Sequence, residues 1–240
     1  RLFESEETAA VADRHRDFFL RLAEEADTAG ILSERFVFPQ FDGLDEEEWA
    51  SLTPKDAQSA IQRGFDALWA LEHLTKPTVA AIEGGCRSVG AELALACDVR
   101  VASESAIFAF PEVDAAWMPS HGATARLPRM SGRARTLELF LSGASVGSRE
   151  AHERGFVERI ASAEASLPKA LDLAQSFARK PRTAVHAIKR ALTEAEEKPY
   201  RNRYLLESQY SGQRLGPDAC LESHNPPGRE ERGYGKSPCH

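Results

Sequence analysis

Two glutamates in the middle of the chain, Glu92 and Glu112, have the clearest potential for chemistry. Glu92 lies in the first turn of a predicted helix, directly after a glycine-bearing turn, and Glu112 follows an apolar run that ends at Pro111. Two carboxylates that meet at one site can act as a general base and a general acid on a single water molecule. Their mutual repulsion raises the pKa of one of them, which makes it an acid that works near neutral pH.

The turn before Glu92 offers a second component, because a helix N-terminus presents free backbone N–H groups and the positive end of a dipole. The helix predicted from Gly90 to Cys97 would direct both towards the oxygen of a bound carbonyl. Loss of one such donor typically costs about 3–4 kcal/mol of barrier. Carboxylates and donors together favour the addition or removal of water next to a carbonyl.

The helices and strands that position these residues are predicted from the periodicity of apolar residues along the chain. Apolar residues at helical intervals predict an amphipathic helix over 54–74, and a nearly continuous apolar run predicts a buried strand over 78–82. The same reasoning predicts helices over 5–29, 133–142, 149–155, 164–179 and 181–197, strands over 99–102, 106–110 and 156–160, and a loop or edge strand over 35–41. Strands that alternate with helices indicate an α/β fold with a parallel sheet.

Composition narrows the class of protein. The chain has 240 residues and a net charge of −7, which argues against a general nucleic-acid binder. No apolar run is long enough for a membrane helix, and no signal peptide is recognisable. The four cysteines have no zinc-binding spacing, and Cys97 is predicted to be a buried thiol, so we expect a reducing, cytoplasmic setting. The first residue, Arg1, suggests a fragment that lacks its true N-terminus.

Several segments together resemble the crotonase (enoyl-CoA hydratase/isomerase) superfamily, almost without gaps from about residue 60 to 192. They are Lys76–Asp98, Val99–Ser103, Phe108–Glu112, Pro119–Leu127, Gly132–Ala134 and Leu141–Gly143. The resemblance implies a spiral of ββα units, a helical C-terminal trimerisation region and an acyl-CoA thioester substrate. It implies no cofactor other than the coenzyme A of the substrate, and no metal. The expected assembly is a homotrimer or a dimer of trimers.

The resemblance also implies roles for individual residues. Glu92 and Glu112 align with the two catalytic glutamates of the family's hydratases. The family's oxyanion hole would use the backbone N–H of Val89, within Ser88–Gly90 where the family has three glycines, and that of Asp42. Ser88, Gly90, Trp117 and His121 are the expected substrate-binding residues.

Each of these residues also has an ordinary structural interpretation, which the sequence leaves open. Glu92 alone could be an acid that interacts with the helix dipole, worth about 0.3–1 kcal/mol. A turn that needs positive φ at Val89 would strain that residue. The further alternatives are a turn hydroxyl for Ser88, an exposed loop position for His121, core packing for Trp117, a second acid or a cap for Asp114, and phosphate contacts, a solvated helix face or a subunit contact for Arg126, Arg129, Arg133 and Arg135.

We therefore expect four segments. These are an N-terminal segment over 1–53, a crotonase-like core over 54–162, a helical region over 163–215 and an irregular tail over 216–240. The expected function is hydration of a 2-enoyl-CoA thioester. The alternatives are another crotonase reaction on an acyl-CoA (isomerase, hydrolase or C–C lyase) or a non-catalytic protein with the same fold.

Overall fold

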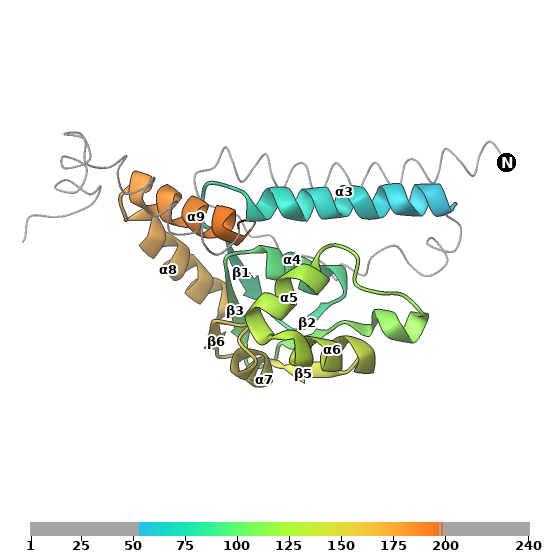
Figure 1. Ribbon diagram of the computed structural model, residues 1–240. Coiled ribbons are helices and arrows are strands. Elements are labelled where there is room, and N and C mark those ends of the chain that lie inside the picture. Colours follow the sequence, from blue (N-terminus) through green and yellow to red (C-terminus); the bar gives the residue numbers. More distant parts are fainter. Residues whose placement is uncertain (1–52, 197, 199–240) are drawn as a thin grey trace, which may run out of the picture. The chain divides into compact units, whose positions relative to one another are not determined.

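The computed structural model describes residues 53–196 and 198 (Figure 1). The expectations for the helix at 5–29, the segment at 35–41, the oxyanion donor at Asp42 and the tail lie outside the described residues. Contacts along the chain separate two compact units, residues 1–174 and 175–240, which we describe one at a time. No helix within the described part of the chain is long and apolar enough to cross a membrane.

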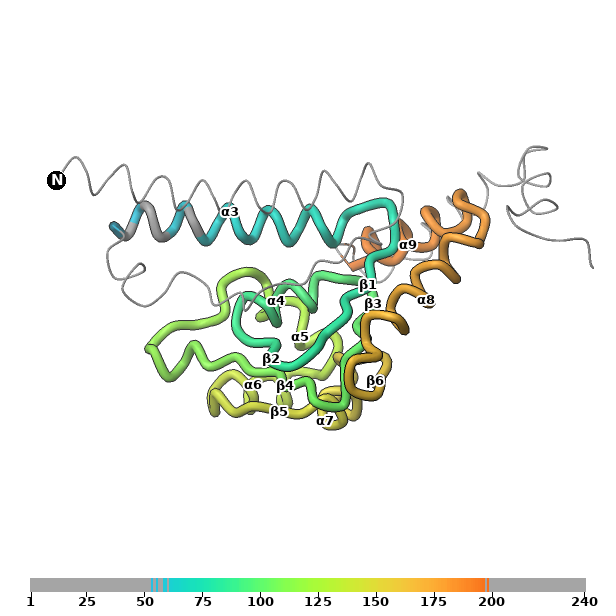
Figure 2. The backbone as a smooth tube through the Cα atoms, turned by 180° about the vertical axis from the view of Figure 1, so that it is seen from behind, coloured from blue at the N-terminus to red at the C-terminus, as the bar shows by residue number. Residues whose placement is uncertain are grey.

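Within the described residues, six strands form two three-stranded sheets, with the orders β1-β3-β6 and β2-β4-β5. Their bounds are β1 Val79–Ile82, β2 Gly85–Arg87, β3 Val99–Ser103, β4 Ile107–Ala109, β5 Ser145–Gly147 and β6 Arg159–Ala161. All pairs are parallel except β4 with β5, and β1 lies beside β3 in both views of the backbone (Figures 1 and 2). The predicted parallel strands are confirmed, whereas the short strands β2 and β5 were not predicted.

The helical elements agree with the predicted helices where these fall within the described residues, apart from α5 and the 3-10 helix η1, which were not predicted as separate elements. Their bounds are α3 Pro54–Glu72, α4 Val89–Ala96, η1 Pro111–Ala115, α5 Ala123–Ser131, α6 Arg133–Ser142, α7 Ser148–Glu153, α8 Ser166–Ala178 and α9 Arg182–Glu196. Gly132, with φ 80°, separates α5 from α6. A residue with a side chain is strained at such a φ, so glycine suits this break.

A spiral connectivity brings the two glutamates near each other. The chain runs from β1 into β2 and α4, and then from β3 into β4 and η1, so that each turn adds one strand to each sheet. In the β2–β4 pair Arg87 lies opposite Ala109, and the N–H of Ser88 donates to the carbonyl of Ala109 at 3.0 Å. Parallel strands end at the same sheet edge, so α4 with Glu92 and η1 with Glu112 both begin at that edge.

Helix α4 is the central support of this arrangement. All its residues from Ala91 to Ala96 are buried. Leu93 and Ala96 pack with Leu68 and Leu71 of α3 in one apolar cluster. Burial of a leucine side chain contributes about 1.5–3 kcal/mol, so this cluster holds α3 against the helix that carries Glu92.

Polar contacts fix the C-terminal end of α4. The buried guanidinium of Arg100 donates to the carbonyls of Ala94 and Cys97, at 3.1 and 2.6 Å, and pairs with Glu158 at 2.5 Å. Orphan carbonyls at a helix end need such partners. Asp98 accepts from the N–H and hydroxyl of Thr78, at 2.6 and 2.9 Å, which joins the segments that lead into β1 and β3.

The buried thiol of this region is that of Cys86, and Cys97 is only partly buried, contrary to the prediction. Burial, and to a smaller extent Cys97, raises the pKa of the Cys86 thiol to about 12. A thiol that stays protonated is a poor nucleophile, so Cys86 packs in the core rather than reacting.

Candidate active site

Glu92 is fully enclosed and held by three donors. Its side chain is 1% exposed. Oε1 accepts from the backbone N–H groups of His121 and Ala123, at 2.9 and 3.0 Å, and Oε2 lies 3.1 Å from His121 Nδ1. A carboxylate offers about four acceptor directions. Three are occupied, and the remaining one belongs to Oε2.

His121 is the partner of Glu92 that the sequence did not reveal. Its exposure is 7%, so the interpretation as an exposed loop histidine is wrong. The ring lies against α3 at Gly64, where an added Cβ would come within 2.2 Å of His121 Cδ2. The only signal in the sequence is a bulky residue beside Gly122 in the Pro119–Gly122 turn, and nothing in its spacing indicates a contact with Glu92.

Arg126 supports the His121 loop from behind. Its guanidinium donates to the carbonyl of His121 at 2.8 Å and forms two hydrogen bonds with Glu72 Oε2 of α3, at 2.7 and 3.1 Å. Arg126 is 4% exposed, so its assignment to a solvated or phosphate-binding basic cluster is wrong. Arg129, Arg133 and Arg135 are exposed.

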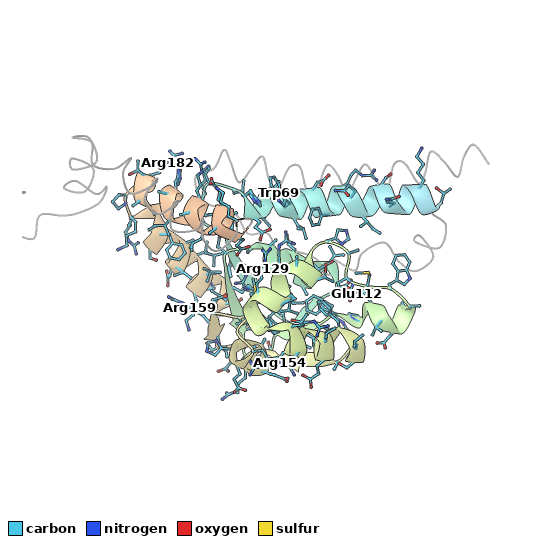
Figure 3. The ribbon with its side chains drawn as sticks, in the orientation of Figure 1. Trp69, Glu112, Arg129, Arg154, Arg159 and Arg182 are labelled. Carbon is cyan, nitrogen blue, oxygen red and sulfur yellow. The ribbon has the colours of Figure 1, made fainter. Side chains whose placement is uncertain are left out.

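Glu112 has the opposite environment from Glu92. It is half-buried, and neither carboxylate oxygen has a hydrogen-bond partner in the described part of the structure; Figure 3 labels it in the green part of the ribbon. Burial is the main cause that raises the pKa of Glu112, the charge of Glu92 raises it further, and the Ser88 side chain, the residue's own backbone and His121 oppose the shift. The sequence predicted the direction, but it assigned the shift to carboxylate repulsion, which is the smaller cause.

Val89 begins α4, and its backbone N–H is available. No carbonyl in residues 53–196 accepts from it, and the first amide of this helix with a backbone acceptor is that of Glu92, which donates to the Ser88 carbonyl at 3.0 Å. Such an N–H can donate a hydrogen bond to an oxygen of a ligand. The expected strain at Val89 is absent there and falls on Ser88, which has φ 50° and ψ −127°.

Replacement of Ser88 by glycine should stabilise the protein by about 1 kcal/mol, because glycine tolerates a φ and ψ that strain serine. The gain is net of the greater chain entropy that glycine has when unfolded. Urea unfolding monitored by circular dichroism measures it, with Ser105→Gly as a comparison at a position of negative φ, where glycine should not stabilise. A loss of stability in Ser88→Gly would show that the serine side chain contributes more than its backbone strain costs.

The other expected binding residues lie around these groups with different exposure. Gly90 is partly buried, and a Cβ there would meet nothing within 4 Å. Trp117 is 44% exposed, so core packing is wrong for it, and its N–H donates to the Glu112 carbonyl at 2.8 Å, which closes the η1 turn. Asp114 is exposed, with its carboxylate against Gly143 at the end of α6. The described residues contain no group of three or more metal-ligating side chains.

An α/β spiral with two glutamates and a free helix amide at one sheet edge defines a crotonase-fold protein. Comparison with known sequences agrees, since the profile of the family "Enoyl-CoA hydratase/isomerase" matches residues 25–214. The chain therefore belongs to this family. A probable enoyl-CoA hydratase of Bacillus subtilis is 33% identical over 193 residues, which cover 77% of this chain and 75% of that protein.

Solved structures support the same assignment. The enoyl-CoA hydratase of Bacillus anthracis superposes with a TM-score of 0.71 and 30% identity, over 75% of this chain and 70% of that one.

Among relatives by sequence, the 2,3-dehydroadipyl-CoA hydratase of Escherichia coli is 37% identical over 156 residues, 65% of this chain and 60% of that protein. The chain thus spans only 60% of that relative, and 52% of a probable mitochondrial enoyl-CoA hydratase of Arabidopsis thaliana.

Proposed function

We propose that this protein is an acyl-CoA-processing enzyme that adds water to the double bond of a 2-enoyl-CoA thioester. The observation that carries the proposal is the contrast between the two glutamates beside the N-terminus of α4. Glu92 is fixed by three donors, whereas the pKa of the unpartnered Glu112 is raised by burial. Environments that differ in this way assign the base and the acid of a pair.

In the proposed reaction, the free acceptor direction of Glu92 Oε2 binds the reacting water. Glu92 takes a proton from this water as its oxygen bonds to C3 of the substrate, and protonated Glu112 gives a proton to C2. The negative charge that develops on the thioester oxygen meets the Val89 N–H and the positive end of α4. One water is consumed, and proton exchange with solvent then returns each carboxyl group to its starting state.

The contacts of His121 argue against a serine hydrolase. A Ser-His-acid triad needs the acid at one ring nitrogen and the nucleophile at the other. Here Ser120 Oγ and Glu92 Oε2 both lie at Nδ1, at 3.2 and 3.1 Å. One nitrogen cannot both donate to Glu92 and take the proton of Ser120, which favours water rather than a serine hydroxyl as the nucleophile.

The remaining parts of the proposal come from the family resemblance. A second oxyanion donor at Asp42 and binding by Ser88, Gly90 and Trp117 remain predictions, as does a cytoplasmic setting. Assembly into trimers also remains a prediction. Ile188 and Leu192 are exposed one helical turn apart on α9, and this apolar pair is available for contact with another subunit. We propose no cofactor beyond the coenzyme A of the substrate.

Incubation with crotonyl-CoA tests the proposal. We expect the absorbance of the conjugated thioester to fall and mass spectrometry to detect a product that is heavier by one water. A 3-enoyl-CoA offered in parallel would reveal isomerisation, and released coenzyme A would reveal thioester hydrolysis. Either of these without hydration would replace the proposed reaction, and no turnover of crotonyl-CoA or of longer 2-enoyl-CoA substrates would reject it.

A further inference from the structure

We propose that His121 is a positioning residue for Glu92: its Nδ1–H donates to Oε2 and leaves a single direction from which that oxygen can accept the reacting water. This inference rests on the proposed role of Glu92 as the base. A carboxylate oxygen only accepts hydrogen bonds, so Nδ1 carries the proton in the 3.1 Å contact between the two side chains.

The contact between His121 and Glu92 matters because each carboxylate oxygen of Glu92 can accept only about two hydrogen bonds. Backbone N–H groups occupy Oε1, and these donors persist whatever side chain stands at position 121. The imidazole alone occupies one of the two directions of Oε2. Without it, a water could bind Oε2 in either of two places, of which one faces the substrate. Misplacement of a reacting group by about 1 Å can cost about 100-fold in rate.

Contacts from two other helices hold the ring in place. Arg126 of α5 binds the His121 carbonyl and is itself anchored by Glu72 of α3. Gly64 of α3 leaves room for the ring, because a Cβ there would lie 2.2 Å from Cδ2 and 2.4 Å from Nε2. Arg126 therefore fixes the backbone that carries the ring, and the packing at Gly64 restricts the ring itself, as a group that sets the direction of another side chain needs.

Two variants separate hydrogen bonding from packing. In His121→Asn the amide nitrogen stands where Nδ1 stood and can still donate to Oε2, whereas His121→Leu keeps comparable bulk and loses the donor. With crotonyl-CoA we expect kcat to fall by about 10–100-fold in His121→Leu and by no more than about threefold in His121→Asn. The KM should stay within about twofold in both. Equal loss in both variants, or a rise in KM with kcat unchanged, would overturn the proposal.

Gly64→Ala displaces the ring without altering it. Its Cβ would collide with the imidazole, so we expect kcat to fall by about tenfold in the wild-type background. In the His121→Ala background the space is empty, and Gly64→Ala should change kcat by less than twofold while stabilising α3, since alanine is the better helix former. A loss of kcat of the same size in both backgrounds would contradict the inference.

A separate measurement distinguishes this inference from the proposed function. In the wild-type protein, ¹⁵N NMR of the His121 ring should identify Nδ1 as the protonated nitrogen, and Glu92→Gln should change that signal. A wild type with this signature that hydrates no enoyl-CoA would reject the proposed function. A wild type that hydrates crotonyl-CoA while His121→Leu retains its kcat would reject the positioning role.

Discussion

Glu112→Gln is expected to lower kcat for the hydration of crotonyl-CoA by about 10²–10⁴-fold while the protein remains folded. The reason is that an amide cannot deliver the proton that the proposed reaction places on C2. Neither oxygen of Glu112 has a partner at hydrogen-bonding geometry in the described structure, and an amide can still interact with the Ser88 hydroxyl that lowers the pKa of Glu112, so the substitution should leave the fold intact. Steady-state kinetics and circular dichroism measure the two effects.

Asp114→Asn is the matched control, because Asp114 lies on the same η1 turn and is exposed. It should retain kcat within about threefold. A Glu112→Gln variant with unimpaired hydration would remove Glu112 from the mechanism, and an equal loss in Asp114→Asn would assign the effect to the turn rather than to the acid.

The difference in stability between Glu112→Gln and the wild type should depend on pH in a defined direction. The folded-state pKa of Glu112 is raised above its ordinary value, so folding favours the neutral form. The neutral carboxyl of Glu112 contributes its full stability below the pKa of about 4.3 that glutamate has in the unfolded chain. That contribution is lost as pH rises through the pKa of Glu112 in the folded protein. Glu112→Gln should therefore have a higher Tm than the wild type at neutral pH, and the difference should vanish at low pH.

Glu92→Gln is expected to lower kcat by about 10²–10⁴-fold as well, because a neutral amide cannot take a proton from the reacting water. Its carbonyl oxygen can still accept from the N–H groups of His121 and Ala123, and a change of tautomer lets His121 accept from the amide nitrogen. The variant should therefore fold. Hydration of crotonyl-CoA by Glu92→Gln at the wild-type rate would reduce Glu92 to a residue that only secures the loop before α5.

The double variant Glu92→Gln/Glu112→Gln gives a sharper test, since groups that act on the same step are strongly non-additive. We expect it to be slower than either single variant by less than about tenfold. Glu92→Ala is expected to behave differently, because two buried N–H groups lose their acceptor at a cost of about 1–3 kcal/mol each. Urea unfolding measures that loss of stability.

The sequence allowed the fold to be predicted where its patterns are long. The amphipathic α3 and the longer apolar runs that contain β1 and β4 are visible in the sequence, whereas β2 and β5 are three-residue strands with glycine and polar residues and a single buried side chain each, which gives no apolar run and no visible alternation. Their pairing is set by tertiary contacts with β4. The failure to predict β2 matters for the site, because β2 ends directly before Ser88 and the start of α4.

The candidate site was predicted in part for a related physical reason. Glu92 and Glu112 stand out because acids after apolar segments are visible in the sequence. The partners of Glu92 come from the loop before α5, and no local pattern connects a helix acid to a distant loop. No local pattern predicts the ion pair between Arg126 and Glu72 either, because these residues are far apart in the sequence. The strain at Ser88 was not predictable because it depends on the turn between β2 and α4.

A crystal structure with acetoacetyl-CoA tests the central claim most directly, because this 3-oxo thioester has the carbonyl of the substrate but no double bond to hydrate. We predict the thioester oxygen about 3 Å from the Val89 nitrogen, with the 3-oxo group between the carboxylates of Glu92 and Glu112. A thioester bound away from the N-terminus of α4, or a 3-oxo group that only one of the two carboxylates can reach, would contradict the account.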